Sequence, residues 1–151
     1  MEQFRELKVL IVDDDLAFLD LIAGLLRSLG IKTVERADSR AHAAEFLAAL
    51  KSPIDCIICD IAMLGGNGLQ LLKEVRCGGF KYVRLDATFM LLTAVKHPAA
   101  IKVASQLDVN GYLTKPVSVD ALRDGIAKAR ARVFALDFAR YKQVAIPGPT
   151  A

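Results

Sequence analysis

The stretch from Lys8 to Asp15, KVLIVDDD, joins a run of aliphatic residues to three consecutive acids. Such a short, almost wholly apolar run is typical of a buried β-strand, and the acids mark its end. Beyond the acids, apolar residues recur at three- and four-residue steps from Leu16 to Leu29, which predicts an amphipathic helix. Asp15 is placed to cap the start of that helix, and Gly30 follows its end. A strand that leads directly into a helix is the repeating unit of α/β folds.

The same strand–helix unit recurs along the chain, five times in all. The strands are near-continuous apolar runs rather than alternating ones, which is typical of a parallel sheet with helices on both faces. Right-handed crossovers then give a doubly wound α/β domain, whose chemistry collects beyond the carboxyl ends of the strands. The other predicted strands are 31–35, 55–59, 88–93 and 111–114, and the other predicted helices are 39–51 (capped by Ser39), 69–77, 98–107 and 118–133 (capped by Ser118).

The composition indicates one globular domain. Of the 151 residues, 54% are hydrophobic and 25% are charged, which is enough to fill a core without metal or disulfide staples. No apolar run reaches the roughly 18 residues that a membrane helix needs, and the N-terminus lacks the apolar core of a secretion signal. We therefore expect a cytoplasmic protein without membrane contact. The net charge of +3 is small for a nucleic-acid binder.

Three cysteines, an odd number in a chain without a secretion signal, argue for reduced thiols. Cys56 and Cys59 form a C-x-x-C motif, a spacing that also occurs in zinc and redox sites. Here they lie in a predicted strand, where residues three apart point to opposite faces and lie roughly 10 Å from each other. We therefore expect both to be small core residues, neither metal ligands nor disulfide partners.

Polar side chains stand at the ends of four predicted strands. Asp13 and Asp14 end the first strand, Asp60 the third, Thr93 the fourth and Lys115 the fifth. Parallel strands bring these groups to one edge of the sheet, where two carboxylates about 4 Å apart repel by about 4 kcal/mol at an effective dielectric near 20. Either a hard divalent cation such as Mg²⁺ or a proton on one carboxylate would relieve that repulsion. Acids, Mg²⁺, a lysine and a hydroxyl together are typical of phosphoryl-transfer sites.

Four motifs at these strand ends, in this order, carry a family resemblance. They are LIVDDD (Leu10–Asp15), IICDIAM (Ile57–Met63) with a glycine five residues beyond it, LLTA (Leu91–Ala94) and GYLTKP (Gly111–Pro116). Over roughly residues 7–132 the chain resembles the receiver domains of two-component response regulators. The resemblance implies a flavodoxin-like, CheY-like sheet of five parallel strands in the order 2-1-3-4-5.

The resemblance also implies roles for the residues around the acids. Asp60 would be the nucleophile that accepts the phosphoryl group. Asp14 would bind Mg²⁺ directly and Asp13 largely through water, and the backbone carbonyl of Ala62 would complete the protein ligands. From the residues alone, Asp13 or Asp14 could simply cap the first helix.

The remaining implied roles concern the phosphoryl group after its transfer. Lys115 would pair with its oxygens, and Thr93 would turn its hydroxyl toward it. Tyr112 occupies the position of the switch aromatic, which changes rotamer together with Thr93, and the Lys115–Pro116 peptide bond would be cis. From the residues alone, Thr93 could be an ordinary strand residue and Tyr112 an ordinary half-buried one.

The resemblance implies a stand-alone signalling switch rather than an enzyme, although such a domain assists its own phosphorylation and dephosphorylation. A sensor histidine kinase or a phosphotransfer protein would supply the phosphoryl group, and output would be binding to a downstream protein effector. Residues 1–133 would form the receiver, and 134–151 a helical extension with a disordered end.

Two alternatives to a signalling switch are a phosphate sink without an output partner and a phosphorylation-independent pseudo-receiver scaffold. A third, a haloacid-dehalogenase-like phosphatase, is disfavoured because Ala17 stands where its motif needs a hydroxyl or β-branched residue.

Several residues depart from the family pattern. Leu64 stands where proline is usual, which predicts a more mobile loop after Asp60. Ala62 and Val95 occupy the two variable positions that govern hydrolysis, and neither side chain can hold a water by a hydrogen bond, so we expect slow autodephosphorylation. The segment 78–87 is longer than usual, and its apolar side chains predict packing on the domain or on a partner. These side chains are Phe80, Tyr82, Val83 and Leu85.

The C-terminal extension carries an aromatic stripe. Phe134, Phe138 and Tyr141 are spaced by four and three residues, which predicts that the last helix continues to about Lys142. The stripe either folds back onto its own domain or serves homodimerisation or partner docking, which is the interpretation we favour. The extension is too short for the usual helix-turn-helix or winged-helix output domain, so we expect no direct DNA binding.

Overall fold

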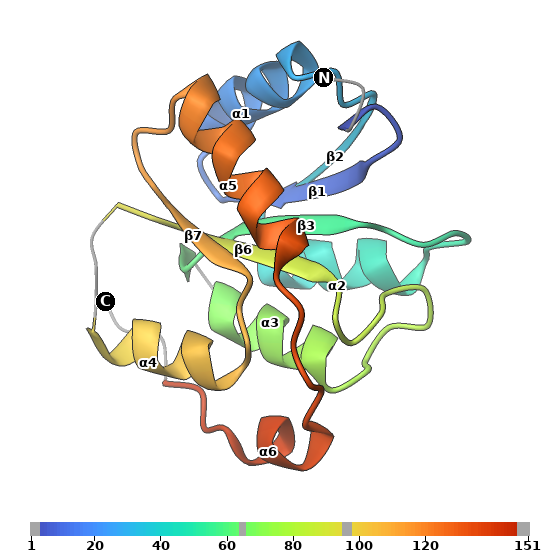
Figure 1. The fold of residues 1–151 in the computed structure, drawn as a ribbon, viewed down its shortest axis with the longest axis vertical. Helices are drawn as coiled ribbons and strands as arrows, with labels where there is room; N and C mark the ends of the chain where they lie inside the picture. The colour runs from blue at the N-terminus through green and yellow to red at the C-terminus, as the bar shows by residue number, and fades with distance from the viewer. Residues whose placement is uncertain (1–3, 64–65, 95–97, 148–151) are drawn as a thin grey trace.

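A five-stranded parallel sheet forms the centre of the computed structural model, which describes residues 4–63, 66–94 and 98–147 (Figure 1). All neighbouring strands of this sheet run parallel, as the apolar sequences of its central strands predict. Their order confirms the predicted arrangement 2-1-3-4-5, because a short pair of strands that interrupts the numbering stands apart from the sheet. The strands lie in the order β2 (Thr33–Ala37), β1 (Lys8–Val12), β3 (Cys56–Asp60), β6 (Thr88–Thr93) and β7 (Gly111–Thr114).

Among the described residues, six helices accompany the sheet. Two pack on one face and three on the other, and the sixth lies beneath the group of three, away from the sheet (Figure 1). None of the six combines the length and the apolar composition that crossing a bilayer requires. The first face carries α1 (Leu16–Ser28) and α5 (Val119–Ala131), the second carries α2 (Arg40–Ala48), α3 (Gly68–Arg76) and α4 (Pro98–Gln106), and the outer helix is α6 (Phe138–Gln143).

Local signals set the helix ends. Asp15 caps α1, and its side chain accepts a hydrogen bond from the backbone N–H of Phe18 at 3.2 Å. Ser39 caps α2 and Ser118 caps α5 in the same way. Gly30 follows α1 with a φ of 94°, a left-handed conformation that glycine adopts without steric cost. The predictions for all four positions are confirmed.

The predicted strand 31–35 lies two residues further along, at Thr33–Ala37. Ile31 is buried, but its N–H donates to the carbonyl of Leu26, so it completes the end of α1 instead of starting the strand. β2 is also an edge strand whose side chains are mostly exposed, so its boundaries leave little trace in the apolar pattern.

Two clusters of buried apolar residues fill the space on the two sides of the sheet. Cys56 belongs to the cluster under α1 and α5, and Cys59 belongs to the cluster under α2, α3 and α4. Neither cysteine forms a disulfide. Burial raises the pKa of the Cys56 thiol to about 12, which keeps it in the unreactive thiol form. Both are core residues on opposite faces of β3, as predicted.

The prediction that the last helix runs to about Lys142 is wrong. α5 ends at Ala131, and residues 132–137 are not helical. Asp137 then caps a separate helix, α6, by accepting a hydrogen bond from the backbone N–H three residues on, at 3.0 Å. A strong local cap therefore decides where the second helix starts, although the aromatic spacing alone fits a single helix.

The aromatic stripe of the extension is divided between core and solvent. Tyr141 is fully buried and belongs to the core cluster that includes α3. Phe138 is 47% exposed, and Phe134 is half-buried. Tyr141 thus fits the alternative in which the stripe folds back onto its own domain.

The segment 78–87 packs on its own domain, which is one of the two predicted alternatives. Phe80 and Val83 are 8% and 3% exposed. Arg76, at the end of α3, is 1% exposed and was not anticipated as a core residue. Its guanidinium donates five hydrogen bonds of 2.6–2.9 Å, which tie α3 to this segment and to the turn between α4 and β7. The acceptors are the carbonyls of Leu85, Ala87, Leu107 and Asp108 and the side chain of Asn110.

The substitution Arg76→Met should lower the free energy of unfolding by about 3–5 kcal/mol, because buried carbonyls would lose their donors. Methionine fills much of the same space, so the loss reports hydrogen bonds more than a cavity. Urea denaturation followed by circular dichroism measures the change. Arg84→Met is the control, since the Arg84 side chain is 80% exposed. A loss below about 1 kcal/mol for Arg76→Met would show that these bonds contribute little.

Candidate functional site

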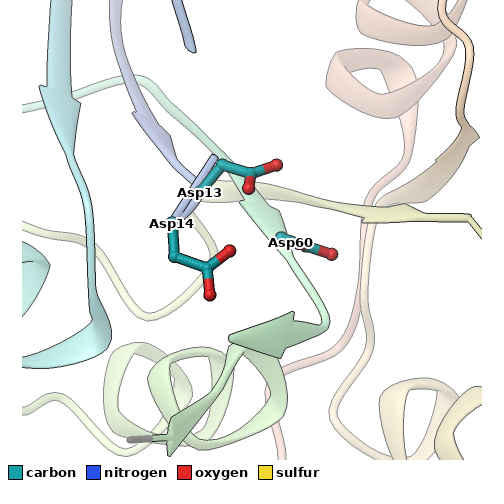
Figure 2. A group of neighbouring side chains, drawn as sticks. All are labelled: Asp13, Asp14 and Asp60. Atoms are coloured by element: carbon teal, nitrogen blue, oxygen red, sulfur yellow. The ribbon is translucent and has the colours of Figure 1, made fainter. Parts of the chain in front are cut away.

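Three carboxylates meet at the carboxyl end of the sheet (Figure 2). Asp13 and Asp14 directly follow β1, and Asp60 is the last residue of β3, the strand paired with β1. One oxygen from each side chain lies within 4.8 Å of the other two. Asp13 and Asp60 are 1% and 8% exposed, whereas Asp14 is exposed. The parallel pairing of β1 and β3 is what brings the acids together.

A lysine faces the acids. Lys115 directly follows β7, and its Nζ lies 2.7 Å from Asp13 Oδ2 and 3.4 Å from Asp60 Oδ2. The ammonium group also lies over the ring of Phe18, 4.2 Å from the ring centre. Burial disfavours the charge, but the hydrogen bond to Asp13 and the nearby carboxylate charges outweigh it and raise the pKa of Lys115. The Lys115–Pro116 peptide bond is cis, as predicted.

The environment changes the protonation of Asp60. Burial raises the pKa of Asp60, and the negative charge of Asp13 raises it further. Lys115 and a backbone hydrogen bond from Ala62 lower it, and the resulting pKa is about 6. In the absence of metal, mildly acidic solution therefore leaves a proton on Asp60, one of the two ways of relieving the repulsion. Above that pH, a cation is the remaining way.

The donor set fits a hard divalent cation. The candidate ligands are all oxygens, and three carboxylates carry more negative charge than Lys115 offsets. Oxygen ligands of Mg²⁺ lie about 2.1 Å from the ion, hence roughly 3–4 Å from one another, which small side-chain movements would reach from the observed separation. Because Asp14 is exposed, one side of the group is open to the waters that Mg²⁺ retains.

A short hairpin follows Asp60. It consists of β4 (Ala62–Met63) and β5 (Gly66–Asn67), paired antiparallel so that the first residue of β4 lies opposite the last residue of β5. The sequence did not predict this pair of strands. Leu64, on which the expectation of a mobile loop rests, and Val95 lie outside the described residues.

Gly68 begins α3 in close contact with Asp60. Its N–H donates to the carbonyl of Ile61 at 2.8 Å, which closes the hairpin onto the helix. A Cβ at this position would overlap the carbonyl oxygen of Asp60 and lie 3.1 Å from the side chain of Leu91. The glycine of the sequence motif is therefore required for space, so that the helix can start this close to the acid.

Thr93 and Tyr112, the predicted switch residues, lie on adjoining strands. Thr93 ends β6 and is 5% exposed, and its backbone carbonyl accepts a hydrogen bond from the N–H of Lys115 at 2.9 Å. Tyr112 is half-buried in β7, and its hydroxyl donates to the carbonyl of Ile101 in α4 at 3.2 Å. Thr93 is thus held beside Lys115, and Tyr112 is tied to α4.

Two residues near the acids had no role in the sequence prediction. Phe18, in the first turn of α1, supplies the ring beneath the Lys115 ammonium group. Asn67 caps α3, and its Oδ1 accepts a hydrogen bond from the N–H of Gln70 at 2.9 Å. The sequence offered one signal for each of them. Phe18 is an aromatic residue just after the first acids, and Asn67 is an asparagine just before an apolar helix.

The substitution Asp60→Asn should stabilise the metal-free protein at neutral pH. The folded protein holds the Asp60 proton more tightly than the unfolded chain, where an aspartate pKa is near 3.8. Stability is therefore lost as the pH rises from about 4 through 6, and Asp60→Asn should recover about 1–3 kcal/mol at about pH 7.5.

Thermal unfolding in EDTA at about pH 4 and about pH 7.5 measures this effect. Asp124→Asn, which changes an acid on the surface of α5 with a 63% exposed side chain, is the control. An equal gain at both pH values, or no gain at the higher one, would contradict the assignment of the raised pKa to Asp60.

The chain resembles known proteins over most of its length. A family profile described as "Response regulator receiver domain" matches residues 9–127. Chemotaxis protein CheY-3 of Vibrio cholerae is 31% identical over 130 residues, 85% of this chain and 95% of that protein. Chemotaxis protein CheY of Pseudomonas aeruginosa is 33% identical over 128 residues, 84% and 98% of the two chains. A response regulator receiver domain protein from Clostridium thermocellum superposes with a TM-score of 0.71 at 26% identity, covering 82% of this chain and 94% of that one. The chain therefore belongs to the response regulator receiver domain family, and is a signalling protein of two-component systems rather than a classical enzyme.

Proposed function

We propose that this receiver is a phosphorylation-dependent switch whose Asp60 accepts a phosphoryl group from a sensor histidine kinase or a phosphotransfer protein. It signals by binding a downstream protein effector. The observation that carries the proposal is the position of Asp60, which shares the sheet edge with two further acids and lies 3.4 Å from Lys115 Nζ. A cytoplasmic location goes with it, because histidine kinases draw their phosphoryl group from ATP.

In the transfer, an ionised oxygen of Asp60 forms a bond to phosphorus while the bond between phosphorus and the donor nitrogen breaks. The donor nitrogen keeps the electron pair of the broken bond, and Lys115 faces the added oxygens. Bound Mg²⁺ supplies positive charge that offsets the negative charge of the phosphoryl oxygens. The groups that would hold it are the carboxylates of Asp13, Asp14 and Asp60 and the backbone carbonyl of Ala62.

Lys115 and Thr93 would respond to the modification. Lys115 shares its ammonium group between Asp13 and Asp60, and a phosphoryl group adds about −1.5 to −2 charges at one of them. That charge draws the ammonium group away from Asp13 and attracts the Thr93 hydroxyl. Tyr112, which bonds to α4, would then change rotamer and alter the surface of α4, β7 and α5, where we place the effector.

Incubation with acetyl phosphate and Mg²⁺ should add one phosphoryl group to the wild-type chain, as read by intact mass. Asp60→Asn should stay unmodified, and EDTA should prevent the reaction of the wild type. Asp20→Asn is the control and should react like the wild type, because Asp20 is an exposed acid paired with Arg36. An unmodified wild type would favour the pseudo-receiver scaffold, and modification of Asp60→Asn would place the acceptor elsewhere.

We expect the phosphorylated protein to lose its phosphoryl group slowly. Ala62, exposed in β4, has no side-chain group that could hold an attacking water, and the same is true of valine at position 95. Ala62→Asn adds an amide and should speed the loss about two- to tenfold, the effect of one hydrogen bond.

Intact-mass time courses after removal of acetyl phosphate measure both rates. Ala135→Asn, at an exposed position between α5 and α6, is the control and should not change the rate. Rapid loss from the wild type with no phosphatase present would be incompatible with this expectation.

A further inference from the structure

The C-terminal segment, residues 138–147, runs along α3. It comprises α6 and the stretch that follows it, and Figure 1 shows α6 beneath α3 and α4, away from the sheet. The family profile matches the chain only as far as residue 127, so this segment lies beyond the shared receiver. Its contacts with the domain therefore involve residues outside the matched part of the chain.

One anchor of the C-terminal segment lies at the amino end of β7, opposite the edge that carries the acids. The hydroxyl of the fully buried Tyr141 donates to Asp108 Oδ2 at 2.5 Å, and Arg140 forms an ion pair with the same carboxylate. Asp108 lies in the turn between α4 and β7, and Arg76 donates to its carbonyl at 2.9 Å. This end of the segment is thus fixed to the buried polar network under α3.

Two further contacts hold the segment along α3. Lys73, in the last turn of α3, donates from Nζ to the carbonyl of Val144 at 2.7 Å. Asn67, at the start of α3 next to Asp60, donates from Nδ2 to the carbonyl of Pro147 at 3.2 Å. Val144 is itself 6% exposed, so the segment is also packed against the domain at the point where Lys73 holds it. The segment therefore connects the far end of the domain to the hairpin that follows Asp60.

Asn67 contacts three parts of the domain: α3, the C-terminal segment and the hairpin. Its side-chain oxygen caps α3, its side-chain amide holds the C-terminal segment, and its backbone pairs with Ala62 across the hairpin. The hairpin has two residues in each strand, which is too short to be stable alone. Its order must therefore come from what holds its two strands, and Asn67 is the residue through which the segment reaches it.

We propose that the C-terminal segment positions a metal ligand, because it holds Asn67 and thereby orders the backbone of Ala62. The inference rests on the proposed function, in which the Ala62 carbonyl binds Mg²⁺. A ligand loop that is already ordered loses less conformational freedom when the ion binds. The hydrogen bonds that Asn67 and Lys73 donate to the segment are called the tether below. Removing the tether should therefore weaken Mg²⁺ binding although all three carboxylates are unchanged.

A purely structural role for the C-terminal segment makes a different prediction. Tyr141 fills part of the core, so the segment could stabilise the fold without any effect on the metal site. In that case, removing the hydrogen bond from Asn67 to Pro147 while Tyr141 stays in place would leave the Mg²⁺ affinity unchanged. Variants at the tether therefore separate the two roles, whereas removal of the whole segment would not.

Calorimetric titration of Mg²⁺ into the unphosphorylated chain of 151 residues tests the proposal. Asn67→Ser keeps an oxygen to cap α3 but lacks the amide donor, and Lys73→Met keeps the methylene stem but lacks the ammonium donor. Each should weaken Mg²⁺ binding about two- to tenfold, the effect of one hydrogen bond. Lys8→Met is the matched control, because it removes the same charge and a 3.1 Å hydrogen bond to Ser52 away from the segment.

Hydrogen exchange of the metal-free protein gives a second readout. The Gly68 N–H is bonded to the Ile61 carbonyl at the base of the hairpin, so its protection factor reports how well the hairpin is held. The protection factor should fall about two- to tenfold in Asn67→Ser and in Lys73→Met, and should not fall in Lys8→Met.

Weaker Mg²⁺ binding together with lower Gly68 protection, in both tether variants and not in Lys8→Met, supports the proposal. Wild-type affinity in both tether variants overturns it and leaves the proposed function standing. A wild-type protein that does not bind Mg²⁺ overturns the metal site and this inference together. If Asn67→Ser does not fold, Lys73→Met decides the question alone.

Discussion

Asp13 and Asp60 lie side by side because β1 and β3 are hydrogen-bonded neighbours, and the fold buries both side chains almost completely. Two such charges about 4 Å apart repel by about 4 kcal/mol at an effective dielectric near 20. Burial and the charge of Asp13 raise the pKa of Asp60 to about 6, although Lys115 offsets part of the repulsion. Either a cation or a proton therefore lowers the electrostatic free energy of the folded site. In the proposed function, a phosphoryl group on Asp60 would change the same balance by drawing Lys115 away from Asp13.

The sheet could be predicted well because its strands follow a local pattern. β6 and β7 lie at the predicted residues, since each is an apolar run that stops at a polar side chain. β2 begins two residues later than predicted, because Ile31 completes α1 and the strand itself is mostly exposed. The order of the strands followed from the family resemblance and not from the residues, because no local pattern in a strand specifies its neighbours.

Features that depend on tertiary contacts were not accessible from the sequence. Arg76 looks like an ordinary cation at the end of a helix, and it is buried only because acceptors from distant turns converge on it. The aromatic spacing of the extension fits one long helix, yet Asp137 begins a second one. Asn67 is recognisable as a helix cap, but its amide bonds to a carbonyl 80 residues away, which no sequence window contains.

Gly68 carries no functional group, yet it determines how closely α3 can begin beside Asp60. Because even a methyl group there would overlap the carbonyl oxygen of Asp60, the helix start and the backbone of Asp60 are in direct van der Waals contact. A tilt of α3 toward β3 would consequently press on the backbone of Asp60. A substitution that reorients the helix would therefore also act on the backbone that carries the Asp60 side chain.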